Sequence, residues 1–283
     1  MKGYILYDRE GILRNRSFAE AIIDHAEKRS VKIEILLRED VLCTMQDSKL
    51  CLVSKDGRSI TADFIINRCI DPLFAEFAEK SGIKVFNSAE VCRICNDKRL
   101  THIHFAEKGI PMANSVFLNK YDEGYSPSEY PKVLKAPAGH GGNEVFFIKN
   151  EIELKSHSFT QRLIQSPVKT LGKDLRVYVL NGEILSSVLR SSSRDFRSNF
   201  SLGGSAQIYY PSERENDLIK KVIDALPKGA LYVGIDFIFD ADKMLLNEVE
   251  DIVGSRMLYQ KTSIPVHELF TDSIINEMNK GES

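Results

Sequence analysis

The sequence has little net charge and no long apolar run. Its formal net charge is −2 over 283 residues. This near-neutral balance argues against bulk nucleic-acid binding, which usually needs a basic face. No run of about 18 apolar residues occurs, so we expect no membrane span. The first residues turn polar at Asp8, too soon for a signal peptide. We therefore expect a cytoplasmic protein without nucleic-acid or membrane partners.

Cysteine is also scarce. The five cysteines are an odd number, which suggests reduced thiols and agrees with a cytoplasmic setting. Cys92-x-x-Cys95 has the spacing of a redox or zinc motif, but no second cysteine pair and no His-x-x-x-His lies at finger spacing. Because three residues make about one helical turn, we interpret both cysteines as ordinary helix residues.

The first 90 residues alternate between strand and helix patterns. Short apolar runs predict strands, and apolar residues at helical spacing predict helices, so a small α/β layer with a parallel sheet is expected. A hairpin is also predicted, with strands at 50–54 and 59–65 on either side of the turn Lys55–Arg58. The other expected elements are strands at 4–7, 31–37, 64–66 and 85–86 and helices at about 18–26 and 73–80.

Beyond residue 90 the pattern changes from alternating strands and helices to hairpins. A helix is expected from about Lys98 to Lys108, because Gly109 and Pro111 follow it. The strongest hairpin signal is Asn181-Gly182, between strands at 174–180 and 183–189. The length allows two or three compact units. We divide the chain into three, at 1–90, 91–164 and 165–283.

A second predicted hairpin, 233–240 with 244–250, carries three carboxylates. Alternation places Asp236 on the face opposite to the apolar residues, and Glu248 and Glu250 share a face. A three-residue turn at 241–243 would place Asp236 opposite Glu248. Like charges so close are unfavourable without a cation, and Mg²⁺ prefers such oxygen ligands. The alternative is a solvated acidic hairpin edge, and a two-residue turn would break the convergence.

The segment 131–148 reads as a strand, a glycine-rich loop and a strand. Lys135 ends the first strand, and Gly139, Gly141 and Gly142 make the connection. Glycine lets backbone N–H groups approach phosphate oxygens, and a lysine at a strand end can neutralise their charge. The order GxxxxGK[ST] is absent, so this is not a P-loop. A purely structural turn is the alternative, and His140 is either a substrate contact or solvated.

Together these motifs resemble the ATP-grasp superfamily, and most of all the branch of the ribosomal-protein glutamate ligase and the carrier-protein ligase of lysine biosynthesis. The similarity runs in order from about Asn87 to Ile274, and Gly172-Lys-Asp-Leu-Arg176 matches the family strand G-x-D-[IL]-R. The remaining matching motifs are Asn96-Asp97-Lys98, Lys135 with its loop, Leu163–Val168, Arg190, Asp195–Asn199, Gly203-Gly204, Gly234–Phe237 and Asn247–Glu250.

The resemblance implies a fold, an activity and a set of site residues. The fold would be α/β (α+β): an ATP-grasp fold after an N-terminal Rossmann-like domain. The activity would be ATP-dependent ligation of a small-molecule or peptide carboxylate to an amine, through an acyl phosphate. Mg²⁺, or Mn²⁺ in its place, would bind Asp236, Glu248 and Glu250. The implied ATP-binding residues are Lys98, Lys135, Gly139, His140, Gly141, Gly142, Gln165, Ser166, Val168, Lys169 and Asp174; the implied catalytic residues are Arg190, Arg197 and Asn199.

Several positions depart from the family pattern. Ser166 or Lys169 stands at the hinge position that is often acidic, Leu202 replaces a frequent arginine, and Glu250 replaces an asparagine. The changes at Leu202 and Glu250 keep open the alternative of an ATP-binding regulatory protein without ligase turnover. An ATP-grasp kinase is a second alternative. A homo-oligomer is common in relatives and is possible here.

The two arginines of the 174–189 hairpin raise a question of geometry. A strict register about Asn181-Gly182 puts Arg176 and Arg190 on opposite faces, unless a bulge intervenes. We favour Arg190 for the site. For Arg176, an ion pair with Asp174 is the alternative interpretation.

Overall fold

The computed structural model describes residues 1–139, 144–157, 161–192 and 205–280. Five of the site residues expected from the sequence lie outside the described residues, as does Leu202. They are His140, Gly141, Gly142, Arg197 and Asn199. The described part of the chain contains no helix that is both long enough and apolar enough to cross a bilayer.

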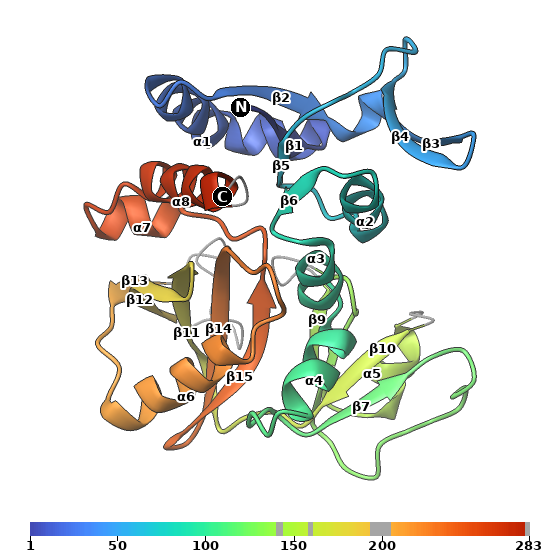
Figure 1. Cartoon of the computed structure of the whole chain (residues 1–283). Coiled ribbons are helices and arrows are strands. Elements are labelled where there is room, and N and C mark those ends of the chain that lie inside the picture. Colours follow the sequence, from blue (N-terminus) through green and yellow to red (C-terminus); the bar gives the residue numbers. More distant parts are fainter. Residues whose placement is uncertain (140–143, 158–160, 193–204, 281–283) are drawn as a thin grey trace.

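The N-terminal layer is a parallel four-stranded sheet in the order β2-β1-β5-β6 (Figure 1). Ile5 and Tyr7 point to the face covered by α1 and α8, whereas Leu6 points to the face covered by α2. Burial on both faces is expected of a parallel sheet, and the predicted α/β layer is confirmed. Its elements are β1 (Lys2–Tyr7), α1 (Arg9–Lys28), β2 (Lys32–Leu37), β5 (Phe64–Asn67), α2 (Pro72–Lys80) and β6 (Lys84–Phe86).

The hairpin predicted across Lys55–Arg58 is largely wrong. After the short helix η1 (Arg38–Asp40), β4 (Lys49–Ser54) pairs with β3 (Val41–Gln46), which precedes it in the chain. Their turn, Asp47-Ser48, has positive φ at both residues. The segment after Arg58 forms only a single bridge, Val53 to Ser59, because the chain then turns into the parallel sheet as β5.

The middle unit has three helices and an antiparallel sheet in the order β7-β10-β8-β9. Cys92 and Cys95 are buried on α3, which agrees with their interpretation as ordinary helix residues. Leu134 and Ile164 point to the face that packs with α5. The elements are α3 (Ala89–Cys95), α4 (Lys98–Ala106), β7 (Ser115–Leu118), β8 (Lys132–Lys135), β9 (Val145–Ile148), α5 (Glu151–Ser156) and β10 (Arg162–Gln165).

The last unit is a five-stranded antiparallel sheet, β13-β12-β11-β14-β15, whose apolar face packs on α6. Figure 1 shows α8 returning to lie beside α1, and the two helices share one core. The elements are β11 (Thr170–Leu180), β12 (Glu183–Ser191), β13 (Ser205–Ile208), α6 (Glu213–Asp224), β14 (Tyr232–Asp240), β15 (Lys243–Glu250), α7 (Arg256–Lys261) and α8 (Val266–Lys280).

Buried polar and backbone contacts tie these units together. The Asn87 side chain donates to the carbonyls of Tyr232 and Asp251 and accepts from the N–H of Leu231, which joins the end of the N-terminal layer to the last sheet. The N–H of Leu246 in turn donates to the carbonyl of Pro111 at 2.9 Å, which joins β15 to the middle unit. The boundaries at residues 90 and 164 stay predictions.

Candidate nucleotide and metal site

The acidic hairpin β14–β15 reaches the predicted convergence by a different route. Asp240 pairs with Lys243, so the turn has two residues and the predicted three-residue turn is wrong. A regular ladder from this turn would place Asp236 opposite Asn247. Instead, a β-bulge inserts Asn247, and Asp236 pairs with Glu248, as predicted. The bulge therefore restores the register that the shorter turn would have lost.

The three carboxylates form a compact group. One oxygen each of Asp236, Glu248 and Glu250 lies within 4.8 Å of the others. A magnesium ion about 2.1 Å from each ligand would hold opposing oxygens about 4.2 Å apart. The spacing and the oxygen-only donor set therefore fit a divalent cation after a small closure of the side chains.

The neighbouring hairpin β11–β12 also contains a bulge. The Asn181-Gly182 turn is confirmed, with positive φ at both residues, but Leu185 is inserted after Ile184. Asp174 therefore pairs with Arg190, and Arg176 and Arg190 share a face. The bulge that the sequence left open is therefore present, and it brings together two arginines that a strict register would have separated.

The two arginines hold the buried acids of this face. Arg190 binds Asp174 through two hydrogen bonds of 2.6 and 2.7 Å and reaches Asp236 at 2.9 Å. Arg176 binds Asp236 through two bonds of 2.7 and 2.6 Å and Glu250 at 2.6 Å. The alternative interpretation of Arg176, an ion pair with Asp174, is therefore wrong, because Arg190 binds Asp174.

This arginine pair changes what each carboxylate can do. Burial alone would raise the pKa of Asp236, but Arg176 and Arg190 outweigh it and keep that pKa below its ordinary value. Both oxygens of Asp236 accept from arginine, and its side chain is only 2% exposed. The side chains of Glu248 and Glu250 are 26% and 28% exposed. The two glutamates are therefore the more accessible ligands for a cation.

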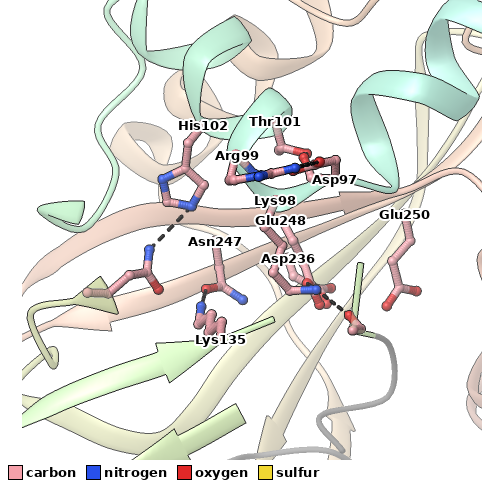
Figure 2. Close-up of polar contacts among 12 residues, drawn as sticks. Asp97, Lys98, Arg99, Thr101, His102, Lys135, Asp236, Asn247, Glu248 and Glu250 are labelled. Atoms are coloured by element: carbon pink, nitrogen blue, oxygen red, sulfur yellow. Dashed lines mark hydrogen bonds and ion pairs between the residues drawn. The ribbon is translucent and has the colours of Figure 1, made fainter. Parts of the chain in front are cut away.

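Two buried lysines face this group (Figure 2). Lys98 is the first residue of α4, after the N-cap Asp97. Its Nζ donates to the carbonyl of Gly139 and lies 3.6 Å from Glu248. Lys135 ends β8, as predicted, and its Nζ donates to Oδ1 of Asn247 at 2.8 Å. The sequence-predicted lysines and carboxylates thus come together from two sheets and a helix.

Burial changes the charge balance of Lys135. Removal from water, together with the nearby ammonium of Lys98, lowers the pKa of Lys135 to about 8, although Glu248 opposes the shift. An anionic phosphate beside this ammonium would stabilise its charged form and so offset the effect of burial. The pair of lysines is therefore suited to an anion rather than to solvent.

The predicted hinge residues lie at the end of β10 and in the segment that joins β10 to β11. Gln165 is buried on the sheet face that also carries Lys135. The backbone N–H of Ser166 already donates to Asn114 and that of Lys169 to Asp240, and the Lys169 side chain is exposed. Val168 is half-buried. Only Gln165 of these four brings a buried polar side chain to the site.

Sequence reasoning missed two residues. His102 lies on α4 one turn beyond Lys98, so helical spacing from Lys98 would have identified it. Asn247 faces Lys135 only because it is the bulge residue, and no signal in the sequence marks the bulge.

A parallel α/β layer followed by two antiparallel sheets, with lysines of one facing carboxylates of the other, defines an ATP-grasp protein. A solved structure of D-alanine–D-alanine ligase from Bacillus anthracis with ATP shares this fold, with a TM-score of 0.71 and 17% identity over 100% of both chains. The RimK-like ATP-grasp domain matches residues 95–274, and the chain belongs to that family.

Two relatives extend the comparison. Uncharacterized protein MG011 of Mycoplasma genitalium is 25% identical over 99% of this chain and 94% of its own length. Glutamate–LysW ligase ArgX of Sulfurisphaera tokodaii is 23% identical over 71% of this chain and 76% of its own. Membership of the family implies the use of ATP and a divalent metal.

Proposed function

We propose that this protein is an ADP-forming carboxylate–amine ligase that works with Mg²⁺. The observation that carries the proposal is the meeting of Lys98 and Lys135 with three carboxylates between two sheets of an ATP-grasp fold. The relative whose name describes a glutamate–LysW ligase supports ligation rather than phosphorylation alone.

In the proposed reaction, a carboxylate oxygen attacks the γ-phosphorus of ATP while the bond from that phosphorus to the bridging β-oxygen breaks. ADP leaves and an acyl phosphate remains. The amine nitrogen then attacks the acyl carbon, the carbon–oxygen bond to phosphate breaks, and the amine gives a proton to solvent. The products are an amide, ADP and phosphate.

The chain's own residues would position and neutralise the phosphates. Lys98 and Lys135 supply positive charge where it develops in phosphoryl transfer. A divalent cation, when bound, would add charge at the phosphates, and Glu248 and Glu250 with Asp236 would hold it. Arg176 and Arg190 act mainly through Asp236, which they fix in place.

The residues proposed for the substrates are outside the part of the chain that the structure describes. Arg197 and Asn199, outside the described residues, remain our candidates for the acceptor carboxylate. Arg194 and Arg197 make the segment before Asn199 basic, which supports an anionic amino acid or peptide as the carboxylate substrate.

The test is a product assay with MgATP, pooled amino and dicarboxylic acids and the twenty amino acids as amines. We expect ADP and phosphate in equal amounts with a product whose mass is acid plus amine less one water. A phosphorylated product without amide, or ADP release that ignores added substrates, would contradict ligation. In the variant Glu248→Gln, which lacks one proposed metal ligand, ADP formation should fall steeply. Glu151→Gln, at an exposed position of α5, is its matched control.

A further inference from the structure

An uncharged hydrogen-bonded group lies near the lysines on the middle unit. Gln165 pairs with Ser115 on one side and with Val133 on the other, while Leu163 pairs with Lys135, so all these side chains project from one sheet face. His102 reaches this face from α4 (Figure 2). The group is deeply buried: His102 and Gln165 are each 3% exposed.

The hydrogen bonds of this group have a fixed direction. The Ser115 hydroxyl donates its one proton to the carbonyl of Ala113 at 2.8 Å. Its oxygen must therefore accept from its other neighbours, His102 Nδ1 at 3.4 Å and Gln165 Nε2 at 3.0 Å. Nδ1 of His102 then carries the proton, and Nε2 of the neutral ring is an acceptor.

The same logic orients the amide of Gln165. Its Nε2 lies 3.2 Å from Nε2 of His102 and donates to it. A reversed amide would place the carbonyl oxygen against two acceptors, the ring nitrogen and the Ser115 oxygen. The amide nitrogen therefore faces His102 and Ser115, and the oxygen Oε1 is turned away from both.

The surroundings keep His102 neutral. Burial, and after it the nearby ammonium groups of Lys135 and Lys98, lower the pKa of His102 to about 4. At neutral pH the ring therefore remains an acceptor for Gln165. A protonated ring would instead donate, and it would favour the reversed amide.

We infer that His102 is a positioning residue which, with Ser115, presents Oε1 of Gln165 as the acceptor for the amino group of a nucleotide base. The inference rests on the proposed function, which places the phosphates at Lys135 on the same sheet face. Val133 and Leu163, both buried, lie on the same sheet face as Gln165 and give it the apolar surroundings that are usual in a site for a purine ring.

This arrangement selects adenine over guanine. Adenine has an amino group, a donor, at the ring position where guanine has a carbonyl, an acceptor. An acceptor fixed at that point bonds the first and repels the second. A variant in which the Gln165 amide is no longer held in this orientation should therefore show a changed ratio of ATP to GTP affinity, rather than a general loss of nucleotide binding.

The test measures the dissociation constants of MgATP, MgGTP and the triphosphate of purine riboside, which lacks the amino group, by calorimetry on the full chain. In His102→Phe we expect the ATP-to-GTP affinity ratio to fall about 10-fold, as for one lost hydrogen bond. Lys135→Ala should weaken ATP and GTP alike and leave the ratio unchanged.

A rescue separates orientation from damage to the fold. In His102→Phe combined with Gln165→Glu, a carboxylate accepts through either oxygen and needs no orientation, so preference for ATP over purine riboside triphosphate should return. Ser115→Ala gives a second, milder test if His102→Phe does not fold. An unchanged ratio in His102→Phe and Ser115→Ala would overturn the inference and leave the proposed function standing. Failure of the wild type to bind any of the nucleotides would overturn both.

Discussion

The proposed nucleotide site has a charged end and a neutral end, and they are built differently. At the charged end, Arg176 and Arg190 share a face, and Asp236 opposes Glu248, only because each hairpin contains a bulge. At the neutral end, Gln165, Ser115 and Val133 follow regular strand pairing. The charged end thus depends on irregular backbone to gather its side chains, whereas the neutral end depends on the direction of its hydrogen bonds.

The largest effect is expected from Glu248→Gln at the charged end. The substitution removes one negative ligand but keeps the shape of a side chain that is 26% exposed and lies 3.6 Å from Nζ of Lys98. Turnover measured as ADP formation should fall about 10³-fold, with an unchanged circular dichroism spectrum. Full turnover in this variant would refute the metal assignment.

A large loss of stability is expected from Arg176→Met, also at the charged end. It leaves Asp236 with Arg190 alone and Glu250 without its 2.6 Å partner. Removal of one partner from a buried ion pair costs about 3–5 kcal/mol, measurable by urea unfolding. Adding Glu250→Gln should recover part of the loss, and a loss below about 1 kcal/mol would show that the pairs are not coupled to folding.

A pH effect is expected at the neutral end. The folded-state pKa of His102, about 4, lies below its ordinary value of 6.5, so protonation favours the unfolded chain. The contribution of the neutral His102 ring to the stability of the fold is complete above pH 6.5 and is lost as the pH falls through about 4. Between these limits the wild type should lose about 3 kcal/mol more unfolding free energy than His102→Phe. Parallel curves for the two proteins would contradict the neutral ring.

The smallest effect is expected from Asn247→Ala. Asn247 belongs to the hairpin of the charged end and contacts Lys135 of the middle unit. The side chain gives Lys135 its 2.8 Å acceptor, and its loss removes one hydrogen bond worth about 1 kcal/mol. MgATP affinity should change by a few-fold, as measured by calorimetry. A change as large as that of Lys135→Ala would mean that Asn247 itself contacts the nucleotide.

Much of the architecture follows from periodicity. The parallel layer and the strands of both last hairpins follow from apolar alternation and from Asn181-Gly182, whose residues accept positive φ. The hairpin β3–β4 was missed because Asp47-Ser48 is a weaker signal than the glycine-containing turn Lys55–Arg58, which the chain uses to enter the next sheet.

The site was harder to predict than the fold, because one residue of register decides which face a side chain takes. The predicted pairing of Asp236 with Glu248 is correct although the predicted turn is one residue too long, because the bulge at Asn247 restores the register. A strict register separates Arg176 and Arg190, but the bulge at Leu185, the exception that the sequence left open, puts them on one face. No local sequence signal marks either bulge, so the ion-pair partners of the two arginines could not be predicted from the sequence and are seen only in the structure.

A structure with Mg²⁺ and a non-hydrolysable ATP analogue tests the central claim most directly. The account predicts a metal ion about 2.1 Å from oxygens of Glu248 and Glu250, phosphates beside the ammonium groups of Lys98 and Lys135, and the base against Gln165. A nucleotide bound with its phosphates away from both lysines, or a metal ion that touches neither glutamate, would contradict it.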